Sequence, residues 1–243
     1  GSMSTSRTNG DAGGGGGSGA GGADGANDGS EDDWLGMVLP PYVQPAKPAA
    51  MEGLGALERL ATTARAPSER VLLVTSQLVV AYDVYPKARR HLLILPRAPI
   101  SGPAALGAQH VPLVRAMSRL ADWVGERLRE REPLALAQPL RAGFHAVPSM
   151  RQLHLHLISQ DLDSPCLKNK KHFNSFATDF FVPPQAWIAQ LQAAGRIAVD
   201  VAAEEAKLKR DMVCPTTGIP LGNLPALKEH LASPEYQRAL HPP

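Results

Sequence analysis

The stretch Gln152-Leu153-His154-Leu155-His156-Leu157-Ile158 alternates leucine with side chains that form hydrogen bonds. Successive side chains of a β-strand point to opposite faces of a sheet, so this alternation predicts a strand over 152–159. The leucines would lie on one face, and His154 and His156 on the other. Two imidazoles on a core face are costly to bury without hydrogen-bond partners, so the pair marks the first candidate site.

Near neutral pH an imidazole is partly unprotonated and can attack phosphorus, so the pair is compatible with a phosphate pocket that contains a nucleophile. Taken alone, the His-x-His spacing also fits a solvated strand face or a metal-binding pair. The flanking residues favour the phosphate pocket. Segment 143–150 adds His145 and a Pro-Ser-Met turn, which can direct the Ser149 hydroxyl and backbone N–H groups at an anion.

A lysine-rich segment follows the predicted strand at 164–176. Its lysines are able to neutralise nucleic-acid phosphates, although a solvated surface is the alternative interpretation. These candidate DNA contacts are Lys168, Lys170 and Lys171.

The rest of the chain predicts an α+β fold. Short β-branched and aliphatic runs predict antiparallel strands over 71–75, 78–84, 91–95 and 142–147. Apolar residues at helical spacing predict helices near 54–64, 111–130 and 185–194. We therefore expect an antiparallel sheet with flanking helices.

The bulk composition excludes some classes of protein. A chain of 243 residues holds one sizeable domain and a small appendage, and its formal net charge of +2 requires any nucleic-acid contact to use a local patch. Two cysteines, Cys166 and Cys214, are too few for a disulfide scaffold and suit a reducing compartment. The sequence has no apolar run near the roughly 20 residues of a membrane helix and no secretory h-region, so we expect no membrane partner.

Four segments are expected along the chain. Residues 1–33 form a glycine-rich tail predicted to be disordered, and its first three residues resemble a cloning scar. Residues 34–67 form a proline-rich arm and a helix. Residues 68–205 form the main domain, and residues 206–243 form a small C-terminal module.

The segment 152–158 is similar to the histidine-triad signature, His-φ-His-φ-His-φ-φ, in which φ is apolar. Segments 83–96 and 143–176, which include Asp-Ser-Pro-Cys-Leu-Lys-Asn-Lys-Lys-His from Asp163, resemble the aprataxin family of the histidine-triad superfamily. This resemblance covers about 70–232. It implies the histidine-triad fold followed by a zinc-finger-like module.

The resemblance implies a DNA-repair hydrolase that removes AMP from 5′-adenylated DNA ends or nicks left by abortive ligation. His154 would attack the AMP phosphorus, form a His154–AMP intermediate and release the DNA 5′ phosphate, and water would then cleave the intermediate. The chemistry needs positioning and charge stabilisation more than acid catalysis, and it requires no cofactor. The product would be AMP. We expect a monomer, and the family implies nuclear residence.

The family pattern also assigns roles to neighbouring residues. His156 would hold a non-bridging phosphate oxygen, and His145 would contact the leaving group or transfer a proton. Gln152 stands where the first triad histidine usually lies, and we expect it to orient its neighbours without carrying charge. The nucleotide- and phosphate-binding candidates are Asp83 for the ribose hydroxyls, Lys87, Ser149, Gln152, and His91 as an orienting group behind the triad.

Residues 212–232 resemble the zinc finger that follows the triad domain in this family. Cys214 and His230 match its first cysteine and first histidine, but Thr217 replaces the expected second cysteine, and threonine is a poor zinc ligand. Glu235 or His241 is a further candidate ligand, and a fourth is still missing. A zinc-binding finger and a metal-free remnant that keeps its helix and leucine packing both remain open.

Two other functions also remain open. One is a general histidine-triad hydrolase of free nucleotides or AMP conjugates, against which the lysine-rich segment and the finger-like tail argue. The other is a DNA-end-binding protein with weakened catalysis, which Gln152 and Thr217 favour. The helix near 54–64 either separates DNA at the lesion, as in the family, or packs on the core; an apolar residue exposed beside the site would favour the first role.

Overall fold

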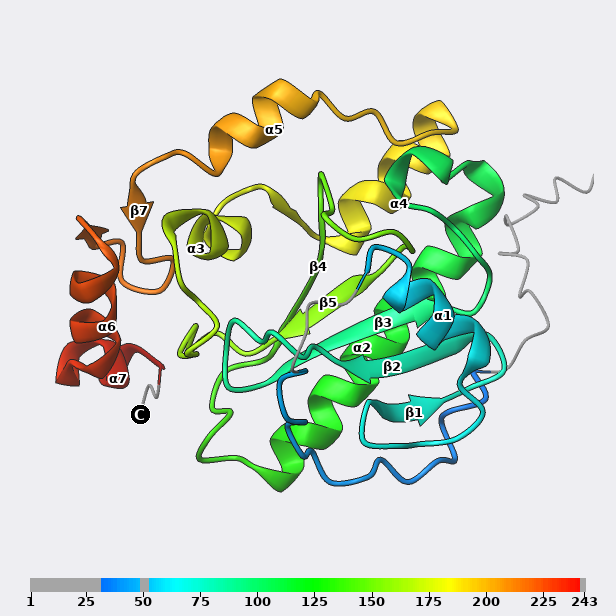
Figure 1. The fold of residues 1–243 in the computed structure, drawn as a ribbon, viewed down its shortest axis with the longest axis horizontal. Helices are drawn as coiled ribbons and strands as arrows, with labels where there is room; N and C mark the ends of the chain where they lie inside the picture. Colours follow the sequence, from blue (N-terminus) through cyan, green and yellow to red (C-terminus); the bar gives the residue numbers. More distant parts are fainter. Residues whose placement is uncertain (1–31, 49–52, 241–243) are drawn as a thin grey trace, which may run out of the picture. The chain divides into compact units, whose positions relative to one another are not determined.

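A computed structural model describes residues 32–48 and 53–240 of the chain. Its centre is an antiparallel sheet of six strands (Figure 1), which confirms the expected α+β class. In spatial order the strands are β1 (Val71–Val74), β2 (Leu78–Tyr82), β3 (His91–Pro96), β5 (Leu155–Ile158), β4 (Arg141–His145) and β6 (Phe181–Val182).

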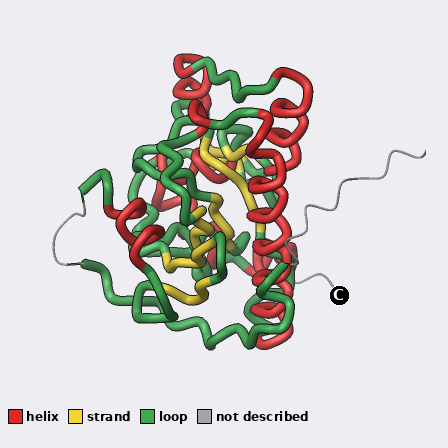
Figure 2. The backbone as a smooth tube through the Cα atoms, turned by 90° about the vertical axis from the view of Figure 1, so that its right-hand side faces the viewer, coloured by secondary structure: helices red, strands yellow, loops and turns green. Residues whose placement is uncertain are grey.

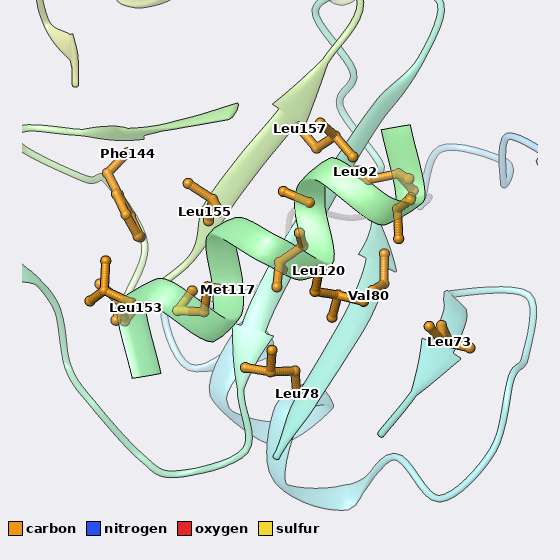
Figure 3. Close-up of a cluster of buried hydrophobic side chains, with 14 of the residues drawn as sticks. Leu73, Leu78, Val80, Leu92, Met117, Leu120, Phe144, Leu153, Leu155 and Leu157 are labelled. Atoms are coloured by element: carbon orange, nitrogen blue, oxygen red, sulfur yellow. The ribbon is translucent and has the colours of Figure 1, made fainter. Parts of the chain in front are cut away.

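Helices cover both faces of this sheet (Figure 2). Alternate residues of β2 pack in opposite directions: Leu78 and Val80 join the core cluster of α2 (Val111–Arg131), whereas Val79 and Ala81 join the cluster of α1 (Ala56–Thr63). Both faces are therefore buried, which explains why this strand is apolar at every position. Figure 3 shows the α2 side of the core, with Leu155 and Leu157 of β5 beside the helix.

Helix α2 packs its apolar side on one face of the sheet. Its buried stripe includes Val114, Met117, Ala121, Val124 and Leu128, as the periodicity predicts. Full burial of side chains such as Met or Leu stabilises a fold by about 1.5–3 kcal/mol each. The helix therefore anchors the strands that carry the candidate site.

The remaining elements are short and lie mostly after β5. They are η1 (Pro103–Ala105), η2 (Ala108–His110), α3 (Lys170–Ala177), α4 (Pro184–Ala194), α5 (Val201–Lys207), β7 (Met212–Val213), β8 (Pro220–Leu221), α6 (Leu224–Ala232) and α7 (Pro234–Leu240). No helix within 32–48 and 53–240 is both long and apolar enough to cross a membrane.

The structure differs from the sequence-based expectation in two places that affect the site. The predicted strand over 152–159 begins only at Leu155, because Gln152 adopts a φ of 80°, which turns the chain before β5. The predicted helix near 185–194 is α4, and the lysine-rich segment also forms a helix, α3, whose N-cap Asn169 accepts a hydrogen bond from the His172 N–H.

The end of the predicted tail is also ordered. Asp32 accepts two hydrogen bonds of 2.7 Å from Arg119, and the Asp33 carboxylate accepts one of 2.7 Å from the Ser76 N–H. The prediction of disorder up to residue 33 is therefore wrong at these two positions, because each carboxylate has a specific partner. The rest of the predicted tail and the scar lie outside the described residues. The other proposed domain boundaries stay predictions.

Candidate active site

Three imidazoles lie side by side on one face of the sheet. His91 comes from β3, His156 from β5 and His145 from β4, and these three strands are neighbours. The ring centroids of His91 and His156 are 5.2 Å apart, and those of His156 and His145 are 4.3 Å apart. With His154, whose ring centroid lies 4.9 Å from that of His156, they form what we call the imidazole cluster.

Aromatic side chains cover this cluster. The Phe176 ring of α3 lies 4.7–5.3 Å from the rings of His91, His145 and His156, measured between centroids. Gly143 of β4 allows a second ring to approach, because a Cβ there would lie 2.7 Å from the Phe181 ring. Burial beneath these rings removes the cluster from bulk water, which strengthens electrostatic interactions inside it.

A chain of hydrogen bonds fixes the proton positions of two imidazoles. The main-chain N–H of Lys87 donates to His91 Nδ1 at 3.1 Å, so His91 carries its proton on Nε2. His91 Nε2 lies 3.0 Å from His156 Nδ1, which must then accept. His156 therefore carries its proton on Nε2, and this buried atom has no hydrogen-bond partner among the described residues. An N–H group held in this way is ready to donate to an anion.

His154 is held in the complementary state. Its Nδ1 lies 2.8 Å from the main-chain carbonyl of Gln152, and a carbonyl oxygen only accepts, so Nδ1 carries the proton. The lone pair of Nε2 is then available to attack. His154 and His145 line a small hollow together with Pro103, Pro148 and Trp187, among others. A larger hollow lies against α6 and α7 and has no imidazole in its lining.

The Gln152 side chain bonds to the main chain at the end of β3. Its amide nitrogen donates to the carbonyls of Pro96 and Ala98 at 2.6 and 2.9 Å, because the positive φ of Gln152 turns the side chain toward the end of β3. The expected orienting role is therefore played by the main-chain carbonyl, which holds His154. The Gln152 amide oxygen is buried without a hydrogen-bond partner in the described part of the chain.

Asp83 and Lys87 lie at the edge of the cluster. One carboxylate oxygen of Asp83 accepts the Tyr85 N–H at 2.7 Å, and the other lies 3.5 Å from His91 Nδ1. The Lys87 ammonium group donates to the Tyr85 carbonyl, and burial lowers its pKa. The half-buried Asp83 carboxylate thus keeps acceptor capacity for a ligand at the rim of the site.

Asp83, His91 and His156 bring three potential metal-ligand atoms within 4.8 Å of one another. The two imidazoles already bond each other through His91 Nε2 and His156 Nδ1, and His91 Nδ1 accepts the Lys87 N–H. The hydrogen-bond chain therefore accounts for their closeness. This arrangement orients His156.

Burial keeps the cluster neutral. It lowers the pKa of His91 to about 4, with the Asp83 charge opposing the shift. It also holds the pKa values of His145 and His156 well below the usual 6.5, and neighbouring imidazoles add to that effect. Burial lowers the pKa of His154 too, against the Gln152 carbonyl and Asp83, which raise it. All four imidazoles are therefore neutral near pH 7, which is the state that a nucleophile needs.

The other predicted contacts lie outside the cluster. Ser149 is exposed on the turn that precedes Gln152. Lys168, just before the N-cap of α3, and Lys171, in its first turn, are also exposed. Lys170 instead pairs with Asp211 at 3.2 Å, because α3 packs beside β7. The two zinc candidates Cys214 and His230 lie in the C-terminal module and not in the cluster.

Sequence reasoning missed two buried residues of α3. Phe176 covers three of the imidazoles. Asn174 of the same helix is fully buried and donates to the carbonyls of Leu208 and Arg210 at 3.2 and 2.7 Å, which fixes the chain that leads into β7. The i, i+3 spacing of Phe173 and Phe176 was the available signal that 170–177 is a helix with a buried face.

Comparison with known sequences finds two matching families, and it finds aprataxins among the similar proteins. Residues 57–172 match the family described as "Scavenger mRNA decapping enzyme C-term binding", and residues 177–234 match "C2HE / C2H2 / C2HC zinc-binding finger". Aprataxin from Danio rerio is 47% identical over 154 residues, which cover 63% of this chain and 46% of that protein. The chain is therefore similar to aprataxins over about two thirds of its length.

A second aprataxin sequence and a solved aprataxin structure are also similar to this chain. Aprataxin from Gallus gallus is 42% identical over 153 residues, covering 63% of this chain and 47% of that protein. The chain thus spans about half the length of these curated relatives. The crystal structure of the aprataxin orthologue Hnt3 in complex with DNA matches with a TM-score of 0.59 and 26% identity, covering 76% of this chain and 93% of that one. These findings confirm the expected resemblance and fold, including a zinc-finger-like C-terminal module.

Proposed function

We propose that this aprataxin-like chain is a hydrolase that removes AMP from 5′-adenylated DNA ends. One observation carries the proposal: His154 presents an Nε2 lone pair, and beside it His156 has a buried Nε2–H without a partner among the described residues. A nucleophile and an anion-binding donor in complementary protonation states suit attack on a phosphorus atom.

In the first step His154 Nε2 forms a bond to the phosphorus of AMP, and the bond to the bridging oxygen breaks. The electron pair leaves with that oxygen, and the DNA 5′ phosphate departs as an anion. His156 Nε2–H donates to a non-bridging oxygen and stabilises the charge that develops there. The imidazole of the adenylated His154 gains positive charge, which the Gln152 carbonyl stabilises by accepting from Nδ1–H.

In the second step water attacks the phosphorus, the bond to His154 Nε2 breaks, and AMP is released. His145 is suited to assist, because its enclosed Nε2 has no hydrogen-bond partner in the described residues and its ring lies 4.3 Å from that of His156. It would contact the leaving group in the first step or transfer a proton in the second.

Residues at the edge of the imidazole cluster would bind the nucleotide. The Asp83 carboxylate would accept the two ribose hydroxyls, and Lys87 and the exposed Ser149 would contact the phosphate. Asp83 lies 3.5 Å from His91, which orients His156, so ribose binding and phosphate binding would use neighbouring groups.

DNA contact is proposed for the surface beside the cluster. The orthologue Hnt3 is described in complex with DNA. In this chain Lys168 and Lys171 are exposed and would neutralise phosphates, with Lys170 held by Asp211. Nuclear residence and a monomeric state belong to the same proposal.

A leucine just before helix α1 is a further candidate for contact with DNA. Leu57 and Ala61 of α1 are buried on the sheet, as packing requires. Leu54, just before the helix, is 57% exposed, and its carbonyl accepts the Arg151 N–H at 3.2 Å, which places it beside the turn that leads to His154. An exposed leucine at this position suits insertion at a DNA end or nick.

AMP release from two substrates tests the proposal: 5′-adenylated nicked DNA and a small AMP conjugate. Wild type should release AMP from the DNA, and His154→Ala should lower the rate by at least about 10³-fold, as loss of a nucleophile does. Release from the small conjugate alone would support a general nucleotide hydrolase. Tight DNA binding without release would support a binding protein.

A further inference from the structure

The C-terminal module has the ββα layout of a zinc finger but not its ligands. Strands β7 and β8 form a hairpin, and α6 follows it. A structural zinc takes four ligands, typically cysteine or histidine, at about 2.0–2.3 Å. Cys214 and His230 are present, Thr217 stands where a second cysteine is expected, and Glu235 is exposed. His241 lies outside the described residues.

The geometry does not fit zinc. Three ligating atoms from His, Cys, Asp or Glu come together in the described residues only at Asp83, His91 and His156, so Cys214, His230 and Glu235 do not form such a group. The His230 Nε2 atom is already engaged, because it lies 3.0 Å from the Thr217 hydroxyl. The two side chains at the position expected for the metal thus bind each other.

The hairpin is held by its own backbone. The Cys214 N–H donates to the Ile219 carbonyl at 2.9 Å, and the Gly218 N–H donates to the Cys214 carbonyl at 2.8 Å. Gly218 adopts a φ of 74°, a conformation that glycine reaches without strain. The turn that carries Thr217 is therefore closed without a metal.

The module also shares a hydrophobic core with the main domain. Cys214 is 2% exposed and packs in one cluster with Leu227 and Leu231 of α6 and with Ile158 and Phe176 of the main domain. A free finger has too small a core to fold alone and depends on its metal. Here apolar burial against the main domain supplies the stabilisation instead.

Tyr236 of α7 ties the two parts together. Its hydroxyl group lies 2.8 Å from the Gln160 carbonyl and 3.2 Å from the Asp161 carbonyl, just beyond the end of β5, and it is positioned to donate to either. Its ring packs on His230, with the centroids 5.2 Å apart. Tyr236 thus links the Thr217–His230 pair to the strand that carries His156.

We propose that the C-terminal module is a metal-free finger, in which the Thr217–His230 hydrogen bond occupies the place of zinc and the core shared with the main domain supplies the stability. The module would then keep its fold and its position when zinc is scarce. Its structure would depend on contact with the main domain and not on metal supply.

Metal content and thermal unfolding of the full chain test this proposal. Protein purified from zinc-supplemented medium without chelator should contain well below one zinc per chain by mass spectrometry of the elements. Its melting temperature should not change on addition of EDTA or of zinc. A content near one zinc per chain, or a melting temperature that EDTA lowers, would overturn the proposal.

A pair of variants tests the replacement bond itself. Thr217→Val removes the hydroxyl at nearly constant volume and should lower the melting temperature by about 2–4 °C, the shift expected for one hydrogen bond in a chain of this size. Hydrogen exchange of the β7–β8 hairpin should also become faster. Thr217→Ser keeps the hydroxyl and should preserve both values. If Thr217→Val matches wild type in both measurements, the bond does not hold the module.

Discussion

The imidazole cluster and the Thr217–His230 pair differ in whether their polar side-chain atoms have hydrogen-bond partners. In the cluster, the hydrogen-bond chain from Lys87 through His91 ends on a buried donor, His156 Nε2, which has no partner among the described residues. In the C-terminal module, the Thr217 hydroxyl and His230 Nε2 satisfy each other at 3.0 Å. The first region thus contains an unpartnered buried donor, whereas the polar groups of the second pair satisfy each other.

The difference has an energetic meaning. An unsatisfied buried polar group costs about 1–3 kcal/mol, so a fold keeps one only where something else compensates. A bound phosphate would compensate His156 and His145 in the cluster. The closed pair in the finger needs no such partner. Histidines of the same chain thus indicate a binding site in one region and structural packing in the other.

The largest expected effect is a difference in kcat between a variant of the imidazole cluster and a variant of the Thr217–His230 pair. His156→Ala removes the donor to the non-bridging oxygen and should lower kcat for AMP release from adenylated DNA by about 10²–10³-fold, as loss of an oxyanion donor does. Thr217→Val removes a polar group from the closed pair and should leave kcat within about twofold. Equal losses in the two variants, measured in single-turnover assays, would erase the distinction.

The second effect concerns stability against pH. The folded pKa of His91 is about 4 and that of the unfolded chain is about 6.5, so the folded state binds fewer protons between these values. The contribution of His91 to the free energy of unfolding should be fully present above pH 6.5 and should be lost as the pH falls toward 4. At about 1.4 kcal/mol per pH unit, this loss is about 3 kcal/mol from His91 alone. The lowered pKa values of the other three imidazoles add in the same direction.

Urea unfolding at several pH values measures this dependence. His91→Asn removes one of the titrating groups and should flatten the slope between pH 6.5 and 4, whatever its effect on stability at pH 7. A slope that stays unchanged in this variant would mean that His91 is not buried in its neutral form.

The smallest effect concerns DNA at the rim of the cluster. Leu54→Ala should lower kcat/KM on nicked duplex DNA by a few-fold and leave a small AMP conjugate unaffected, because about 1 kcal/mol of apolar contact is lost only when DNA is bound. Leu134→Ala is the matched control, since Leu134 is 88% exposed in the loop after α2. If both substrates or both variants respond alike, Leu54 has no special role with DNA.

Much of the fold could be predicted from local patterns. The aliphatic runs of β1, β2 and β3 and the apolar stripe of α2 follow from alternation and helical periodicity, which are short-range signals. The pattern of Leu155, His156 and Leu157 likewise placed His156 on the face opposite the core of α2. The family resemblance carried the rest of the site residues.

Other features depend on contacts between distant residues. The positive φ of Gln152 delays β5 and directs its carbonyl at His154, and it brings the side chain to Pro96 and Ala98, more than 50 positions away. The Thr217–His230 bond and the hydrogen bonds of the Tyr236 hydroxyl group also join separated segments. Local periodicity does not indicate such contacts, so the sequence alone could not predict whether the C-terminal module binds zinc.

Adenylation of His154 is the most direct test of the central claim. The enzyme should be mixed with 5′-adenylated nicked DNA, quenched within one turnover, digested under mild alkaline conditions and analysed by peptide mass spectrometry. We predict that a peptide containing His154 gains the mass of one adenylyl group, and that His154→Ala shows no adduct. AMP release without an adduct on His154, or an adduct on another residue, would contradict the account.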